Sequence, residues 1–135
     1  MLRVLKISPL LAAGLLLAGC GGTITNLTSK QEFRTTNGLY AVEAAFESRQ
    51  QTLRWQDIHP TVVVDNEAFP MHRTELMTNR WETSLQVPDN RRFIYYRFKF
   101  DYDSTGFGSN KSGREMSPIY RLEIVEPGET LHKTP

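Results

Sequence analysis

Apolar and polar residues alternate along much of this chain with a period of two, which is typical of strands that have one buried and one solvated face. In the segment 38–46 the apolar positions are Tyr40, Val42, Ala44 and Phe46. The longest alternation covers residues 93–102. One side of it carries Ile94, Tyr96, Phe98, Phe100 and Tyr102, and the other side carries Tyr95, Arg97, Lys99 and Asp101. We therefore predict two half-buried strands, of which the second is unusually long.

Turn signals separate further segments of the same kind. Asp65–Asn66, Thr78–Asn79 and residues 88–90 interrupt the alternation, and such residues favour turns. The remaining strands are predicted over 52–58, 60–64, 67–70, 81–87 and 117–127, with a loop over 104–113. Trp55 and Trp81 are in phase with the apolar residues of their strands, so both are expected in the core. About seven short strands without a helical period indicate an all-β fold, an immunoglobulin-like antiparallel β-sandwich.

Residues 79–103 also resemble a known family. The stretch NRWETSLQVPDNRRFIYYRFKFDYD contains a strand with Trp81, a turn with Pro88 and an aromatic strand that reads Tyr-x-Phe-x-Phe-Asp. This pattern is similar to that of the immunoglobulin-like modules attached to starch- and glycogen-acting enzymes. The resemblance implies the same sandwich fold, and it makes carbohydrate binding a candidate function.

The N-terminal segment has the layout of a secretory signal. Arg3 and Lys6 precede an apolar stretch over 7–17, which is shorter than the roughly twenty residues of a membrane-spanning helix. The next residues complete the motif Leu17-Ala18-Gly19-Cys20, which resembles the lipobox of bacterial lipoproteins. The resemblance implies cleavage before Cys20, acylation of Cys20 and, because Gly21 rather than Asp follows, sorting to the outer membrane. A plain cleaved signal that leaves an unused cysteine is the alternative.

These features divide the chain into four parts. We expect a lipoprotein signal peptide over 1–19, a lipidated tether over 20–30, a β-sandwich domain over 31–127 and a disordered tail over 128–135. The segment TITNLT, residues 23–28, leaves open an additional edge strand. The chain after the signal is long enough for one domain with a single core. Because the chain has one cysteine, no intramolecular disulfide can support that core.

Charge and residue spacing exclude several function classes. Removal of Arg3 and Lys6 with the signal moves the formal net charge from +1 to about −1, so the basic excess typical of nucleic-acid binding is absent. The three histidines, His59, His72 and His132, are scattered and accompany neither a nucleophile elbow nor a metal-ligand spacing. We therefore expect no catalytic residues, no cofactor and no nucleic-acid partner.

One acidic segment has a partial metal-binding pattern. DYDSTG, residues 101–106, matches the opening of an EF-hand calcium loop, but Ser112 occupies the position where that loop supplies a bidentate Glu. Our prediction is that the chain holds no metal. A calcium site completed by Glu115 is left open.

The polar side of the strand 93–102 is the predicted binding surface. Tyr95, Arg97 and Lys99 form an aromatic and cationic strip, and Phe107 lies in the following loop. Tyr and Arg are enriched in the energetic centres of protein interfaces. We expect a lipid-anchored, non-catalytic envelope protein that binds or helps to assemble a protein partner at the membrane surface. The alternatives are a surface glycan-binding module and a strand face whose charges serve only solubility.

Overall fold

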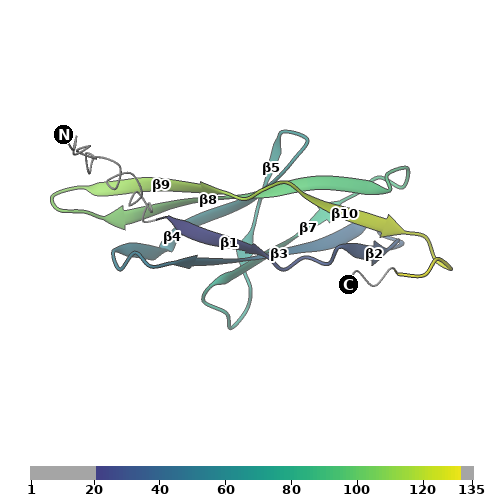
Figure 1. The fold of residues 1–135 in the computed structure, drawn as a ribbon, viewed down its shortest axis with the longest axis horizontal. Helices are drawn as coiled ribbons and strands as arrows, with labels where there is room; N and C mark the ends of the chain where they lie inside the picture. The colour runs from purple at the N-terminus through teal and green to yellow at the C-terminus, as the bar shows by residue number, and fades with distance from the viewer. Residues whose placement is uncertain (1–20, 132–135) are drawn as a thin grey trace, which may run out of the picture.

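The computed structural model describes residues 21–131 and contains two facing β-sheets (Figure 1). The ten strands of the described part are β1 (Gly22–Asn26), β2 (Gln31–Phe33), β3 (Leu39–Ser48), β4 (Leu53–Val64), β5 (Glu67–Pro70), β6 (His72–Arg73), β7 (Arg80–Gln86), β8 (Phe93–Thr105), β9 (Asn110–Met116) and β10 (Tyr120–Val125). We call the first sheet, in the order β1-β3-β7-β6, sheet A. Sheet B has the order β2-β10-β8-β4-β5, and β9 pairs with β8 beside it.

The predicted immunoglobulin-like β-sandwich is therefore confirmed, with three differences in detail. The fold has more strands than the seven expected, because β1, β2, β6 and β9 are short or were assigned to other elements. It also contains one parallel pair, β2 with β10, whereas all the other neighbours are antiparallel. The predicted segments 52–58 and 60–64 form one continuous strand, β4.

The core lies between the two sheets and consists of the alternating residues that the sequence indicated. From β3 these are Tyr40, Val42, Ala44 and Phe46, and from β8 they are Ile94, Tyr96, Phe98, Phe100 and Tyr102. Phe46 and Phe100 stack across the sandwich with ring centroids 4.9 Å apart, and Trp81 meets Phe100 edge-on at 5.4 Å. Such offset and edge-to-face pairs add to the stabilisation from apolar burial.

A proline and a tight turn shape β4 and β5. The carbonyl of Pro60 accepts a hydrogen bond from the Met71 N–H (3.0 Å), so it points away from β8. Because the nitrogen and the carbonyl of one strand residue point to the same neighbour, the Pro60 nitrogen also points away from β8. The missing N–H therefore removes no hydrogen bond of the β4–β8 ladder. Asp65 and Asn66 have φ values of 49° and 68° and connect β4 to β5 as a two-residue hairpin. Positive φ at both central positions suits the twist of a hairpin, and Asn and Asp tolerate it.

Trp55 is a correction to the predicted core. It is 36% exposed, whereas Trp81 is buried as expected. Leu53 pairs with Ser104 and Ile58 pairs with Tyr102, so five steps along β4 oppose two steps along β8. Residues 54–57 of β4 are therefore unpaired and form a bulge. Because the excess of residues is odd, the side chains on either side of the bulge alternate in opposite phase. Trp55 lies within the bulge, and its side chain is therefore partly exposed instead of buried in the core.

The loop predicted over 104–113 is largely a β-hairpin. β8 continues to Thr105 and β9 begins at Asn110, so only residues 106–109 connect the two strands. Seven residue pairs, from Lys99↔Met116 to Thr105↔Asn110, join β8 and β9. The polar sequence of β9 shows no apolar alternation because its residues 110–112 and 114 are exposed. In Figure 1 this hairpin projects at one end of the elongated molecule.

Both predicted boundaries of the folded part also shift. Residues 22–26, assigned to a tether, form β1 and pair with β3 over five residues, so the alternative of an edge strand is the one that the structure contains. At the other end, Glu129 lies in the segment expected to be disordered, yet it forms an ion pair with Arg92 at 3.2 Å. The predicted signal peptide and Cys20 lie outside the described residues, as does 132–135.

Candidate functional site

The outer side of sheet B carries three of the four predicted binding residues. Tyr95, Arg97 and Lys99 project from β8 away from the core, as the alternation predicted. Register places Arg121 of β10 opposite Tyr95, Val63 of β4 opposite Arg97, and Met116 of β9 opposite Lys99. We call this surface the β8 face and define it by Phe93, Tyr95, Arg97, Lys99, Met116 and Arg121.

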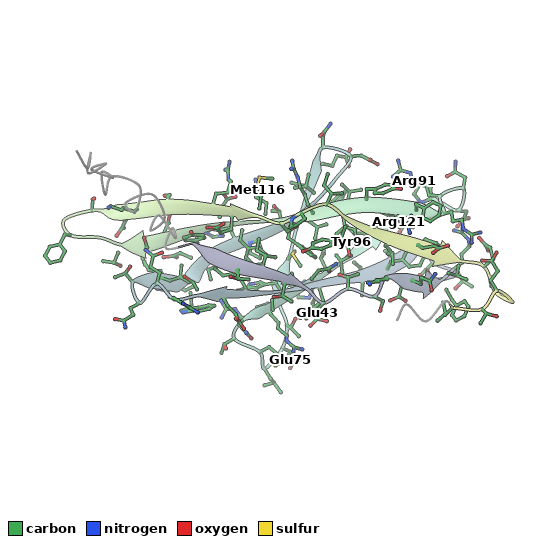
Figure 2. The ribbon with its side chains drawn as sticks, in the orientation of Figure 1. Glu43, Glu75, Arg91, Tyr96, Met116 and Arg121 are labelled. Atoms are coloured by element: carbon green, nitrogen blue, oxygen red, sulfur yellow. The ribbon has the colours of Figure 1, made fainter. Side chains whose placement is uncertain are left out.

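The β8 face combines exposed apolar side chains with a rigid support. Tyr95 is 57% exposed, and Phe93, Met116 and the adjoining Ile119 are exposed as well. β8 is hydrogen-bonded on one side to β4 and on the other to β9 and β10, so its backbone is held along almost its whole length. Figure 2 shows Met116 and Arg121 along sheet B, whereas Glu43 and Glu75 lie on the other side of the molecule. Met and aromatic residues are enriched at the centres of protein interfaces.

The cations of this face differ in their partners. Within residues 21–131, neither Arg97 nor Arg121 forms an ion pair, although the Arg121 guanidinium lies 5.0 Å from the Phe93 ring centroid. Lys99 instead lies 3.4 Å from Asp101, which also accepts a 2.6 Å hydrogen bond from Arg114. Partial burial acts to raise the pKa of Asp101, but Arg114 and Lys99 outweigh it and the net pKa is lowered. Arg97 and Arg121 are thus the cations of this face that have no ion pair in the described part of the chain.

A polar cleft adjoins the β8 face beside β10. Its volume is about 570 Å³, and its lining includes Asn26, Lys30, Tyr120, Arg121 and Glu123. Two of the lining residues are joined, since Asn26 Nδ2 donates a hydrogen bond to the Tyr96 hydroxyl (3.0 Å). Burial raises the pKa of Tyr96, and its hydrogen bonds with Thr28 and Asn26 act in the opposite direction. Because Arg121 borders both surfaces, a partner on the β8 face can also extend a polar group into this cleft.

Phe107, the fourth predicted binding residue, does not join this face. It lies in the connection between β8 and β9 and is fully exposed. Ten residue steps of extended strand separate Tyr95 from Thr105, which corresponds to about 33 Å. The sequence grouped Phe107 with Tyr95 because Tyr95 lies in the strand that leads into the loop of Phe107, but the length of that strand separates the two residues.

Sequence analysis missed several residues of these surfaces. Arg121 and Met116 reach the β8 face from other strands, and only strand pairing reveals their position. Trp55 forms a separate exposed feature: its ring is nearly parallel to that of Trp81, with centroids 6.5 Å apart, and its carbonyl accepts a 2.7 Å hydrogen bond from Arg73 Nη2. A signal was present for Trp55, because Leu53 and Ile58 are an odd number of residues apart and an uninterrupted strand cannot bury both.

Residues 101–105 of the acidic segment belong to the paired strand β8, and each Asp there has a local partner. Ser112 donates a hydrogen bond to Asp103 (2.8 Å), and Asp101 contacts Lys99 and Arg114. Among residues 21–131, no group of three or more His, Cys, Asp or Glu side chains is arranged to hold a metal ion. The same part of the chain has no helix of the length and apolar character needed to cross a membrane.

Comparison with known proteins yields structural likenesses but no family. No protein-family model matches the chain, and no curated protein matches its sequence. A DUF4785 family protein from Legionella pneumophila is 8% identical with a TM-score of 0.45, over 75% of this chain and 28% of that chain. Murine CRIg is 8% identical with a TM-score of 0.43, over 78% of this chain and 98% of that chain. This chain thus spans less than a third of the Legionella protein.

Proposed function

We propose that this protein is a lipid-anchored, non-catalytic component of a bacterial cell envelope that binds a protein partner through the β8 face. The observation that supports partner binding most directly is the grouping of exposed Tyr95 and Phe93 with Arg97 and Arg121, two arginines that form no ion pair within residues 21–131. Aromatic and Arg side chains dominate the binding energy of protein interfaces. A rigid strand also loses little conformational entropy when a partner docks on it.

The proposed lipid anchor would confine the β8 face to a membrane surface. In the proposal, Cys20 carries the acyl chains and becomes the first residue of the mature chain, and Gly21 favours the outer membrane over the inner one. Two or more acyl chains hold a protein firmly, whereas a single chain binds only marginally. Confinement to a membrane raises the effective concentration of the domain for a partner in the same membrane. Moderate affinity on the β8 face is then sufficient for assembly.

Cys20→Ser tests the anchor. We expect the variant to remain unprocessed or to leave the membrane fraction, since the thiol is the point of acylation. Cell fractionation and intact-mass measurement give the readout, and Ser29→Ala, a change at an exposed site in the cleft, is the control. Normal cleavage with unchanged membrane association of Cys20→Ser would contradict the anchor.

Crosslinking from position 95 in living cells tests the β8 face. A photo-crosslinking amino acid at position 95 in living cells should give a discrete protein adduct, and Arg97→Ala should reduce that adduct. The matched control places the crosslinker at Leu39, a 41% exposed residue of β3, in a chain that carries Arg80→Ala.

A double variant, Tyr95→Ala with Arg97→Ala, is the second test of the β8 face. It should keep the parental melting temperature, because exposed substitutions usually change stability by less than about 0.5 kcal/mol. A folded double variant that captures the identified partner at parental levels would exclude the face.

A surface glycan-binding module is the second candidate, and Trp55 is the observation that favours it. Sugar recognition uses exposed aromatic rings, and Trp55 is partly exposed beside the guanidinium of Arg73. Affinity electrophoresis in gels that contain polysaccharide separates the two functions. A glycan-binding module would be retarded, Trp55→Ala would abolish the retardation, and the Tyr95→Ala, Arg97→Ala variant would not. Unretarded migration in starch, glycogen and peptidoglycan fragments would count against this second function.

A further inference from the structure

The proposed lipid attachment site lies very close to the folded domain. Only Gly21 separates Cys20 from β1, which begins at Gly22. β1 is held by five residue pairs with β3 and by a hydrogen bond from the Gly22 N–H to Glu115 Oε1 (3.3 Å). Two residues of extended chain span at most about 7 Å. An anchor at Cys20 would therefore hold the domain against the bilayer instead of on the flexible tether that the sequence predicted.

The β8–β9 hairpin lies beside this attachment point. Gly22 contacts Glu115 of β9, and from there β9 extends to Asn110 at the base of the connecting turn. Five residue steps of strand correspond to about 17 Å. The hairpin projects at that end of the molecule, beyond the connection between β3 and β4 (Figure 1). Its tip thus extends well past the point where the anchor would enter the membrane.

The tip has the side chains expected of a shallow membrane contact. Phe107 is the most exposed large apolar side chain of residues 21–131, and it lies between Gly106 and Gly108. Lys111, which is also exposed, follows four residues later. Aromatic residues gather at the headgroup level of bilayers, and lysines beside them reach the phosphates with their charged ends. No core contact explains Phe107, because its whole side chain is solvent-accessible.

Geometry restricts how the hairpin can meet the bilayer. If β9 stood perpendicular to the membrane with Cys20 at the headgroups, the base of the turn at Asn110 would lie about 17 Å deeper, well inside a hydrocarbon core about 30 Å thick. That arrangement would bury Lys111, four strand residues beyond Glu115, in hydrocarbon at a large cost for its charge. A tilted hairpin avoids this cost and still lets the Phe107 ring enter the headgroup region.

We propose that Phe107 and the hairpin tip insert shallowly into the lipid bilayer and, together with Cys20, fix the domain in a tilted orientation on the membrane. This inference rests on the proposed acylation of Cys20. It assigns to Phe107 a lipid contact instead of the protein contact that the sequence analysis expected. Two separated contacts restrict rotation of the domain, whereas a single anchor would leave it free to rotate.

Depth-dependent fluorescence quenching tests the insertion. Phe107→Cys is prepared in the full, lipidated protein, labelled with an environment-sensitive NBD probe and reconstituted into phosphatidylethanolamine–phosphatidylglycerol vesicles. Acylation blocks Cys20, so the new thiol is the one that reacts. The matched control is Leu76→Cys, since Leu76 is equally exposed but lies in the loop between β6 and β7. Figure 2 shows the neighbouring Glu75 on the sheet A side, away from the hairpin.

The expected result is a blue-shifted emission at position 107 and loss of more than half of its intensity with headgroup-level nitroxide lipids. The probe at position 76 should keep the spectrum it has in detergent-free buffer. Mass spectrometry of the same samples reports whether Cys20 carries lipid. A lipidated protein with a water-like spectrum at position 107, or with equal quenching at positions 107 and 76, overturns the insertion and leaves the anchor intact. An unmodified Cys20 overturns the anchor and the insertion together.

Discussion

At the scale of single residues, the two tryptophans show how much depends on one bulge. Trp55 and Trp81 both alternate with apolar neighbours in the sequence, and their rings lie nearly parallel, 6.5 Å apart. Trp81 packs edge-on against Phe100 within the core and is 2% exposed. Trp55 is 36% exposed and lies beside Arg73, whose guanidinium is also 5.0 Å from the Trp81 ring centroid. Similar local sequences therefore give one core residue and one surface residue.

Substitution of each tryptophan by Ala should give different losses of stability. Trp81→Ala removes a buried aromatic side chain, and we expect the free energy of unfolding to fall by about 3–5 kcal/mol. Trp55→Ala removes a partly exposed ring, and we expect a loss of about 1 kcal/mol. Urea denaturation followed by circular dichroism measures both. Equal losses would show that Trp55 belongs to the core after all.

At the scale of elements, β8 organises sheet B because it pairs with β4 along one side and with two different strands, β9 and β10, along the other. β9 pairs with residues 99–105, and β10 pairs with residues 93–96. Ser117 closes the gap between the two ladders. Its N–H donates to the Phe98 carbonyl (2.9 Å), and its hydroxyl oxygen accepts from the Phe98 N–H (2.8 Å). The same hydroxyl donates to the Pro118 carbonyl (2.8 Å), so the buried side chain is satisfied.

Ser117→Ala should destabilise the domain more than an exposed Ser substitution does. The change leaves the buried Phe98 N–H without an acceptor, and an unsatisfied buried group costs about 1–3 kcal/mol. Ser84→Ala on the solvent side of β7 is the control, with an expected change below about 0.5 kcal/mol. Thermal unfolding of both variants gives the comparison. If the two melting temperatures coincide, Ser117 does not carry the junction.

At the scale of the whole molecule, the position of β1 links the fold to the proposed membrane setting. β1 covers the side of the sandwich where Phe46 lies, and a side chain at Gly22 would collide with the Phe46 ring. Asn26 at its end reaches the Tyr96 hydroxyl. β1, the strand that would follow the lipid anchor directly, therefore covers part of the core.

Truncation tests this role of β1. A soluble chain that begins at residue 31 lacks β1, exposes Phe46 and loses the hydrogen bond between Asn26 and Tyr96. We expect its free energy of unfolding to be lower by at least about 3 kcal/mol than that of a chain that begins at residue 21, an effect comparable with loss of a buried aromatic. Dispersion of amide resonances and the melting temperature provide the readouts. Two equally stable chains would mean that β1 is dispensable and that residues 21–30 can act as a tether.

Local pattern by itself determined the longer core strands β3, β7 and β8 and most of the core of this protein. The period-two alternation of β3, β7 and β8 identified the buried side chains of all three strands, and the Asp65–Asn66 hairpin followed from turn chemistry. The outward direction of Tyr95, Arg97 and Lys99 was equally predictable, because burial of one face of a strand specifies the other.

Tertiary pairing decided the rest. The exposure of Trp55 depends on how β4 aligns with β8, and the polar β9 becomes a strand because β8 offers it a partner. Arg121 and Met116 join Tyr95 and Lys99 only through register, while the length of β8 removes Phe107 from the same face. Alternation within a segment reports which side of a strand is buried. Hydrogen bonding to a segment distant in sequence decides which strand lies beside it, and no local pattern contains that information.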